Sequence, residues 1–231
     1  MGLGLAIGIQ HAFEPDHMAA VSTQIVKSKF VKTQLRTLIK DSITKSSLLG
    51  IAWGAGHATT LVLIGLLVNA FAVAIHDHVF YGFEFVVGAM LVILGITTLS
   101  NKKIRIRHKH PHKHQDGSIH LDEHMHNNSN HIHTHKSYLI GLIHGLAGSG
   151  VIVVLTATSL NSIDAILGFV GIFGIGSILG MMFVGSIVGI PLALGNKIKL
   201  IKKIMRYSAG IFSLVIGFNI MYQIALIGIL F

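Results

Sequence analysis

The sequence has no cysteine, few prolines and few charged residues, and each shortage excludes a class of protein. Without cysteine in its 231 residues, the chain can form no disulfide, thiolate metal site, thiol redox relay or iron-sulfur cluster. Asp, Glu, Lys and Arg make up 12% of the chain, against about 25% in soluble domains. With 52% hydrophobic residues and a mean hydropathy of +0.69, the composition indicates an integral membrane protein.

Apolar segments long enough to cross a bilayer recur along the chain. A membrane-spanning helix needs about 20 apolar residues, whereas a barrel strand would alternate polar and apolar residues over about ten, a pattern that is absent. We therefore predict an all-α integral membrane protein, multi-pass in the cell membrane. Its six transmembrane helices are expected near Gly2–Val26, Ser46–Ala74, Val79–Leu99, Tyr138–Leu160, Ile163–Leu194 and Tyr207–Phe231.

Basic residues lie only in alternate loops. All 18 Lys and Arg residues fall within 27–45, 102–136 and 197–206. Because short basic loops face the cytoplasm, both termini are predicted to be extracytoplasmic. The same distribution argues against a basic patch on a soluble surface, so the expected partner is the lipid bilayer and no nucleic acid.

Short motifs recur in the same order in the two halves. Because three helices separate the copies, the second half enters the membrane from the opposite face, as in the inverted repeats of secondary transporters. We predict a 3+3 inverted repeat, with residues 1–99 and 138–231 as its halves. The matches are Ile7–His11 with Ile140–His144, Gly54–His57 with Gly174–Ser177, and Gly88 and Gly95 with Gly210 and Gly217.

The cytoplasmic loop 100–137 is polar, basic and rich in histidine. Such a composition buries too little apolar area to offset its ordering entropy, so we expect disorder. The loop is predicted to bind metal weakly, as a buffer, a sensor or a feed to an exporter; the alternative is an inert spacer. Its ten histidines are His108, His110, His112, His114, His120, His124, His126, His131, His133 and His135.

Ionisable side chains in a bilayer cost at least about 2.5 kcal/mol each and need a partner or a function. By distance along their helices, His11 and His57 reach the midplane, where carriers bind their substrate. Pro15 predicts a kink or an unwound turn, which would let His11 converge with Asp16 and His17. Imidazole and carboxylate ligands suit Ni²⁺, Co²⁺, Zn²⁺ or Fe²⁺ better than Mg²⁺ or Ca²⁺.

Other polar residues are candidates for the ion path. Glu14 could support the ligands or carry protons, and His144 could be either a ligand or a buried hydrogen-bonding group. Repeat symmetry suggests an unwound turn near Ser149 and a role for Ser177, although the glycines around them also suit close helix packing. Glu84 could simply extend to the outer surface. No His-Glu-x-x-His pattern is present, so we expect no enzyme and no cofactor.

The first helix resembles the nickel/cobalt transporter family NiCoT, whose signature is His, four residues, then Asp-His, here His11 and Asp16-His17. Gly56–Thr59 is similar to that family's second-helix element. The segment Leu142–Gly150 is more similar to the UreH-like branch, which is associated with nickel supply to urease. The acidic Asp-Thr motif of longer family members has no counterpart here. The absent cysteines argue against the related thiol-carrying electron-transfer proteins.

The resemblance implies that His11, Asp16, His17 and His57 bind a metal ion, with Ni²⁺ ahead of Co²⁺. We therefore expect a carrier that brings Ni²⁺ or Co²⁺ into the cytoplasm as its substrate. A cytoplasmic metallochaperone or a urease maturation system is the expected recipient. A Ni²⁺/Co²⁺ efflux carrier and a non-transporting metal sensor or accessory protein are the alternatives.

Overall fold

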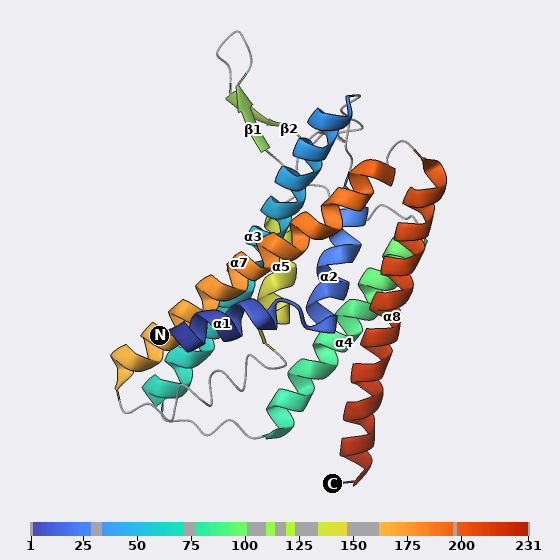
Figure 1. The fold of residues 1–231 in the computed structure, drawn as a ribbon. Helices are drawn as coiled ribbons and strands as arrows, with labels where there is room; N and C mark the ends of the chain where they lie inside the picture. Colours follow the sequence, from blue (N-terminus) through green and yellow to red (C-terminus); the bar gives the residue numbers. More distant parts are fainter. Residues whose placement is uncertain are drawn as a thin grey trace.

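The computed structural model describes residues 2–28, 34–71, 77–100, 110–113, 119–122, 134–146, 162–195 and 198–230. Short helices lie among and against long ones, and a two-stranded hairpin projects from one end (Figure 1). The described helices are α1 (Gly2–His11), α2 (Pro15–Val26), α3 (Leu35–Phe71), α4 (Asp77–Leu99), α5 (Thr134–His144), α7 (Ile163–Gly195) and α8 (Lys199–Leu230). The hairpin consists of β1 (His110–Lys113) and β2 (Ile119–Asp122).

Four of the described helices, α3, α4, α7 and α8, are long and apolar enough to cross a membrane. In contrast, α1, α2 and α5 contain 10, 12 and 11 residues, about half of what a crossing needs at 1.5 Å per residue. The first predicted helix is therefore broken into α1 and α2. The fourth predicted helix ends at His144, and residues 147–160 of that segment lie outside the described part.

Several boundaries differ from the predicted ones. α3, α5 and α8 begin at Leu35, Thr134 and Lys199, before the predicted Ser46, Tyr138 and Tyr207, because polar residues can continue a helix beyond the apolar span. The loop 100–137 was expected to be disordered, but it contains the hairpin, in which His110 pairs with Asp122. Backbone pairing alone can form such a hairpin without a core, although an isolated one is only marginally stable.

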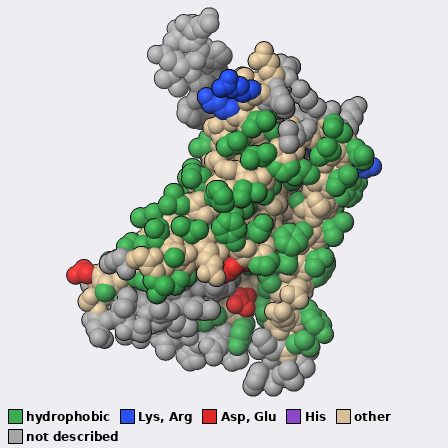
Figure 2. Space-filling view, viewed as in Figure 1, with side chains coloured by type: hydrophobic (Ala, Val, Ile, Leu, Met, Phe, Trp, Pro, Cys, Tyr) green, Lys and Arg blue, Asp and Glu red, His purple; other side chains and the backbone are tan. Residues whose placement is uncertain are grey.

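The outer surface along the helices is hydrophobic (Figure 2). Ile93, Phe183 and Val215 are each more than half exposed. An apolar surface of this extent is unfavourable in water and suits contact with lipid. On the face seen in Figure 2, Lys and Arg gather toward the end that carries the hairpin, whereas Asp and Glu lie toward the other end.

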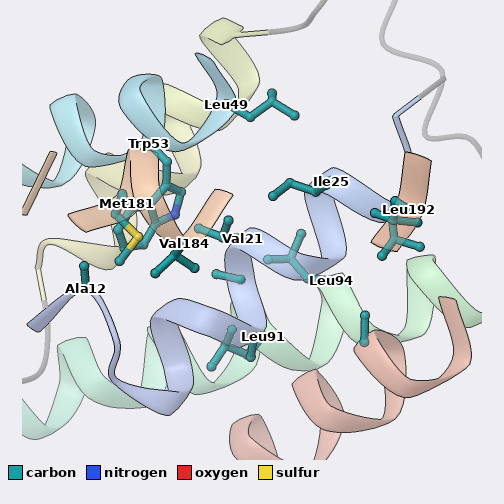
Figure 3. Packing of buried hydrophobic residues seen from close by; sticks show 14 of the residues in the cluster. Ala12, Val21, Ile25, Leu49, Trp53, Leu91, Leu94, Met181, Val184 and Leu192 are labelled. Atoms are coloured by element: carbon teal, nitrogen blue, oxygen red, sulfur yellow. The ribbon is translucent and has the colours of Figure 1, made fainter. Parts of the chain in front are cut away.

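The half-length helix α2 runs through the interior. Its apolar side chains pack with those of α3, α4 and α7 (Figure 3), as Val21 does in the cluster that includes Leu49, Leu91 and Val184. The rest of α2 is largely buried, with Ala19, Ala20, Val21 and Ile25 no more than 2% exposed.

Glycines allow the helices to approach closely, and these approaches occur in corresponding pairs. α1 packs on α7 as α5 packs on α3, and α4 packs on α8. A glycine has no Cβ, so two backbones can come into contact at its position. The pairs of contacts are Gly54 on Ile178 with Gly174 on Ala58, and Gly88 on Gly217 with Gly95 on Gly210.

The contact between α1 and α7 can be tested at Gly8. A Cβ at Gly8 would overlap the carbonyl oxygen of Phe173, whereas a Cβ at Gly82 of α4 meets nothing within 4 Å. We expect Gly8→Ala to reduce stability by roughly 1–3 kcal/mol through overpacking, and Gly82→Ala to cause no loss. Thermal unfolding in detergent measures both. Equal melting temperatures of Gly8→Ala and Gly82→Ala would contradict the close packing of α1 on α7.

A second prediction concerns Lys27, which follows α2 and donates a 2.8 Å hydrogen bond to Thr97 Oγ1 of α4. Burial, with the nearby charge of Lys136, lowers the pKa of Lys27 from 10.5 to about 8. The unfolded chain therefore binds the Lys27 proton more tightly, so stability should rise with pH between about 8 and 10.5. Lys27→Gln should remove this rise from the melting curves, and Lys40→Gln, at another exposed lysine, should retain it. An unchanged pH profile in Lys27→Gln would refute the assignment.

Candidate metal centre

The break between α1 and α2 positions the predicted ligands. The last backbone amides before Pro15 donate to carbonyls three residues back, which closes α1 at His11. Glu14 is extended, with φ −62° and ψ 145°, as the residue before a proline prefers. Pro15 then occupies the first position of α2, where its missing N–H leaves no bond unmade. The kink predicted at Pro15 is confirmed, and it places Asp16 and His17 in the first turn of α2.

Four histidines from four helices meet at this break. His11 ends α1, His17 lies in α2, His57 in α3 and His144 ends α5. The ring centroid of His17 lies 4.2 Å from that of His11, 4.5 Å from that of His144 and 5.2 Å from that of His57. None of the four is more than 3% exposed. The structure thus brings the predicted His11, His17 and His57 together and adds His144.

Short contacts link the rings to one another and to Asp16. His11 Nε2 lies 3.0 Å from His57 Nε2, a spacing that fits a hydrogen bond and also fits two nitrogens bound at right angles to one ion about 2.1 Å away. His144 Nε2 lies 2.9 Å from Asp16 Oδ2, and His17 Nε2 lies 3.6 Å from the same oxygen. Both contacts place the Asp16 carboxylate at the centre.

These groups form two overlapping sets of three. One set is His11, His17 and His57, and the other is Asp16, His17 and His144; within each set the ligand atoms lie within 4.8 Å of one another. We call them the imidazole set and the carboxylate set. Either set has the size and the donor atoms to hold a transition-metal ion.

Several imidazole nitrogens have their hydrogen-bonding capacity unused. The Nδ1 atoms of His17, His57 and His144 are buried and have no hydrogen-bond partner among the described residues. Leaving a buried polar atom unpaired costs about 1–3 kcal/mol. The Nε2 atoms of His57 and His144, by contrast, face His11 and Asp16, where their lone pairs could bind a cation, since a neutral imidazole binds metals through a nitrogen lone pair. The residues at the centre therefore fit a metal ion.

Two aromatic side chains enclose the histidines. The Trp53 ring stacks on His57 at 5.4 Å with an interplanar angle of 8°, and it lies 5.0 Å from both His17 and His144. Phe173 of α7 lies 5.2 Å from His11. Sequence reasoning missed both residues. The spacing of Trp53 and His57, four residues apart on one helix, was the available signal, because such residues share a face.

The remaining predicted residues are at the edge of the centre or elsewhere. Glu14 Oε1 lies 3.0 Å from His11 Nδ1, and its side chain is 39% exposed. Ser177 is buried on α7, one turn after Phe173, and its Oγ has no partner among the described residues. Glu84 is partly exposed on α4. Ser149 lies outside the described residues.

The histidines of the loop 100–137 are not brought into the centre by the described part of the chain. His135 lies in the first turn of α5, and its side chain is exposed. The backbones of His110, His112 and His120 belong to the hairpin. Outside the described residues are His108, His114, His124, His126, His131 and His133.

The helix α5 ends at His144. The unwound turn expected at Gly148–Gly150 lies outside the described residues. Gly145 packs against α3, where a Cβ would lie 2.7 Å from the carbonyl oxygen of His57. This close packing holds the end of α5 beside the other histidines.

Trp53 is the only tryptophan in the chain, so its fluorescence reports on this centre. Ni²⁺ and Co²⁺ have partly filled d shells and quench a nearby indole, whereas Zn²⁺ has a filled shell. We expect saturable quenching by Ni²⁺, reversal by excess Zn²⁺, and loss of quenching in His17→Ala. Gln10→Ala, an exposed neighbour of His11, is the control. Quenching that persists in His17→Ala would place the metal elsewhere.

Comparison with known proteins agrees with a membrane protein of this kind. The family model for the cytochrome C biogenesis protein transmembrane region matches residues 36–219. The urease accessory protein UreH of Bacillus sp. (strain TB-90) is 33% identical over 222 residues, which cover 96% of this chain and 90% of UreH. No solved structure matches.

The similarity to UreH confirms the predicted UreH-like resemblance, while membership of the NiCoT family stays a prediction. Since the chain has no cysteine, it cannot itself carry out thiol-disulfide exchange. The match to the family model spans most of the chain, and the match to UreH spans nearly all of it. The chain therefore belongs to the family of the cytochrome C biogenesis protein transmembrane region and is a membrane homologue of the urease accessory protein UreH.

Proposed function

We propose that this protein carries a divalent transition-metal ion, Ni²⁺ or Co²⁺, across the cell membrane into the cytoplasm. The observation that carries the proposal is the convergence of Asp16 with four buried histidines. Nitrogen-rich ligands with one carboxylate favour these ions over Mg²⁺ and Ca²⁺. The similar UreH is a urease accessory protein, which together with the UreH-like motif favours nickel.

The directions of the helices also favour a cation. His11 is the last residue of α1 and His144 is the last residue of α5. The C-terminus of a helix has unpaired carbonyl groups and about half a negative charge. Two such ends directed at one point attract a positive ion, as the broken helices of other transporters do near the bilayer midplane.

The proposed architecture is six crossings arranged as a 3+3 inverted repeat. In it, α1 with α2 forms one crossing and α5 begins another. A two-fold axis between the halves would convert the contact of Gly54 with Ile178 into that of Gly174 with Ala58, so the paired contacts support the repeat. The basic side chains near the hairpin in Figure 2 support a cytoplasmic hairpin and extracytoplasmic termini.

The membrane potential favours the inward direction. A divalent cation that moves toward a negative interior gains about 4.6 kcal/mol per 100 mV, twice the value for a single charge. The histidine-rich loop would then bind arriving ions weakly and pass them to a cytoplasmic metallochaperone or urease maturation system. Efflux would require coupling to another gradient, for which Glu14 and His144 are the available proton-carrying groups.

Transport can be measured with purified protein in liposomes. Under an inside-negative potential, we expect saturable Ni²⁺ uptake that Co²⁺ inhibits more strongly than Zn²⁺. His17→Ala should reduce uptake at least tenfold because it removes a ligand common to both sets, while Gln10→Ala should leave it unchanged. Binding without flux in the intact protein would favour a sensor or accessory protein. If Ni²⁺ moves only when a proton gradient is imposed across the liposome membrane, and in the direction opposite to the protons, the result would favour an exporter.

A further inference from the structure

The imidazole set and the carboxylate set share one residue, His17, and nothing else. The His17 ring lies between the ends of the two half-length helices, with centroids 4.2 Å from His11 and 4.5 Å from His144. We propose that the two sets are successive positions of one transported ion, and that His17 holds the ion during its transfer from one to the other. This inference rests on the proposed function.

Simultaneous binding of two ions, one in each set, is energetically unfavourable. Each set has only three ligands, so the loss of His17 to its neighbour would leave two. Two divalent cations this close together in a water-poor interior would also repel each other strongly. The sets therefore act in turn, and the centre holds one ion at a time.

The nitrogens of His17 suit a transfer. Nε2 lies 3.6 Å from Asp16 Oδ2, which assigns it to the carboxylate set. Nδ1 is buried without a hydrogen-bond partner among the described residues, so its hydrogen-bonding capacity is also unused. An imidazole can offer either nitrogen to a metal. Because only one nitrogen of a neutral imidazole has a free lone pair at a time, the transfer moves the ion from one nitrogen of His17 to the other while the ring proton moves the opposite way.

The two sets are completed by residues from different parts of the fold. The imidazole set is closed by His11 at the end of α1, which packs on α7 and begins near the N-terminus. The carboxylate set is closed by His144 at the end of α5, which packs on α3 and follows the basic loop.

The sets differ in ligands that can be removed separately. His57→Ala changes only the imidazole set, His144→Ala changes only the carboxylate set, and His17→Ala changes both. Co²⁺ binding can be followed by Trp53 quenching and by the visible absorption of the ion, which responds to its ligands. Ni²⁺ uptake into liposomes gives the second readout. Leu139→Ala, an exposed site on α5, is the control for changes in that helix.

We expect the intact protein to bind one Co²⁺. His57→Ala and His144→Ala should each still bind one, within about tenfold of the original affinity and with different absorption spectra, yet each should lose at least tenfold in uptake. His17→Ala should lose binding, and so should the double variant His57→Ala with His144→Ala. The variant His144→Gln separates the loss of a ligand from a folding defect, because it nearly preserves the side-chain volume. It should reproduce the effect of His144→Ala.

Three results would contradict the proposed transfer of the ion between the two sets. They are two ions bound to the intact protein, loss of binding in His144→Ala as complete as in His17→Ala, or wild-type uptake in His144→Ala. A failure of the proposed function looks different. In that case the intact protein and its variants would bind Co²⁺ as described above, but the intact protein would move no ion across the liposome membrane.

Discussion

A helix that ends inside a bilayer exposes backbone groups that lipid cannot satisfy, and this constraint governs the whole structure. The chain breaks at Pro15, so α2 has to lie inside protein, where Val21 and its neighbours are enclosed by α3, α4 and α7. That enclosure requires the long helices to pack closely around α2. The glycines at the contacts between helices permit such close packing. The same break brings Asp16 and His17 to the end of α1. The ligand cluster and the interior packing are therefore two consequences of one proline.

The parts of the site that could be predicted were those encoded over short distances. The spacing from His11 to His17 and the intervening Pro15 predicted both the convergence of these side chains and the kink, because a proline acts on its own turn. His144 could not be assigned from sequence, since its role depends on the tertiary approach of α5 to α3, 128 residues from its Asp16 partner. Trp53 was not predicted to be part of the site, because the ordinary interpretation of a tryptophan on an apolar helix is a packing role. Helix starts such as Leu35 were missed because polar residues continue a helix beyond the apolar span.

The two halves of the chain correspond in packing and differ in chemistry. Motif alignment matches His11 with His144 and His57 with Ser177, yet most ligands come from the first half. A centre with full two-fold symmetry would offer an ion two equivalent positions. Replacement of one imidazole by a hydroxyl, with Asp16 only on one side, makes the two sets unequal. Inequality of this kind is what a carrier needs if it is to bind an ion from one side and release it to the other.

The charges around the centre suit the cation that the proposed function requires. Neutral imidazoles contribute lone pairs without net charge, and Asp16 contributes one negative charge. The C-terminal ends of α1 and α5 add about half a negative charge each. The N-terminus of α2, which begins beside Asp16, adds about half a positive charge, so the surroundings amount to roughly one and a half negative charges. A trivalent ion would leave the buried site clearly positive, and uncompensated charge is costly in a membrane interior. The imidazoles then discriminate among divalent ions by favouring transition metals over Mg²⁺ and Ca²⁺.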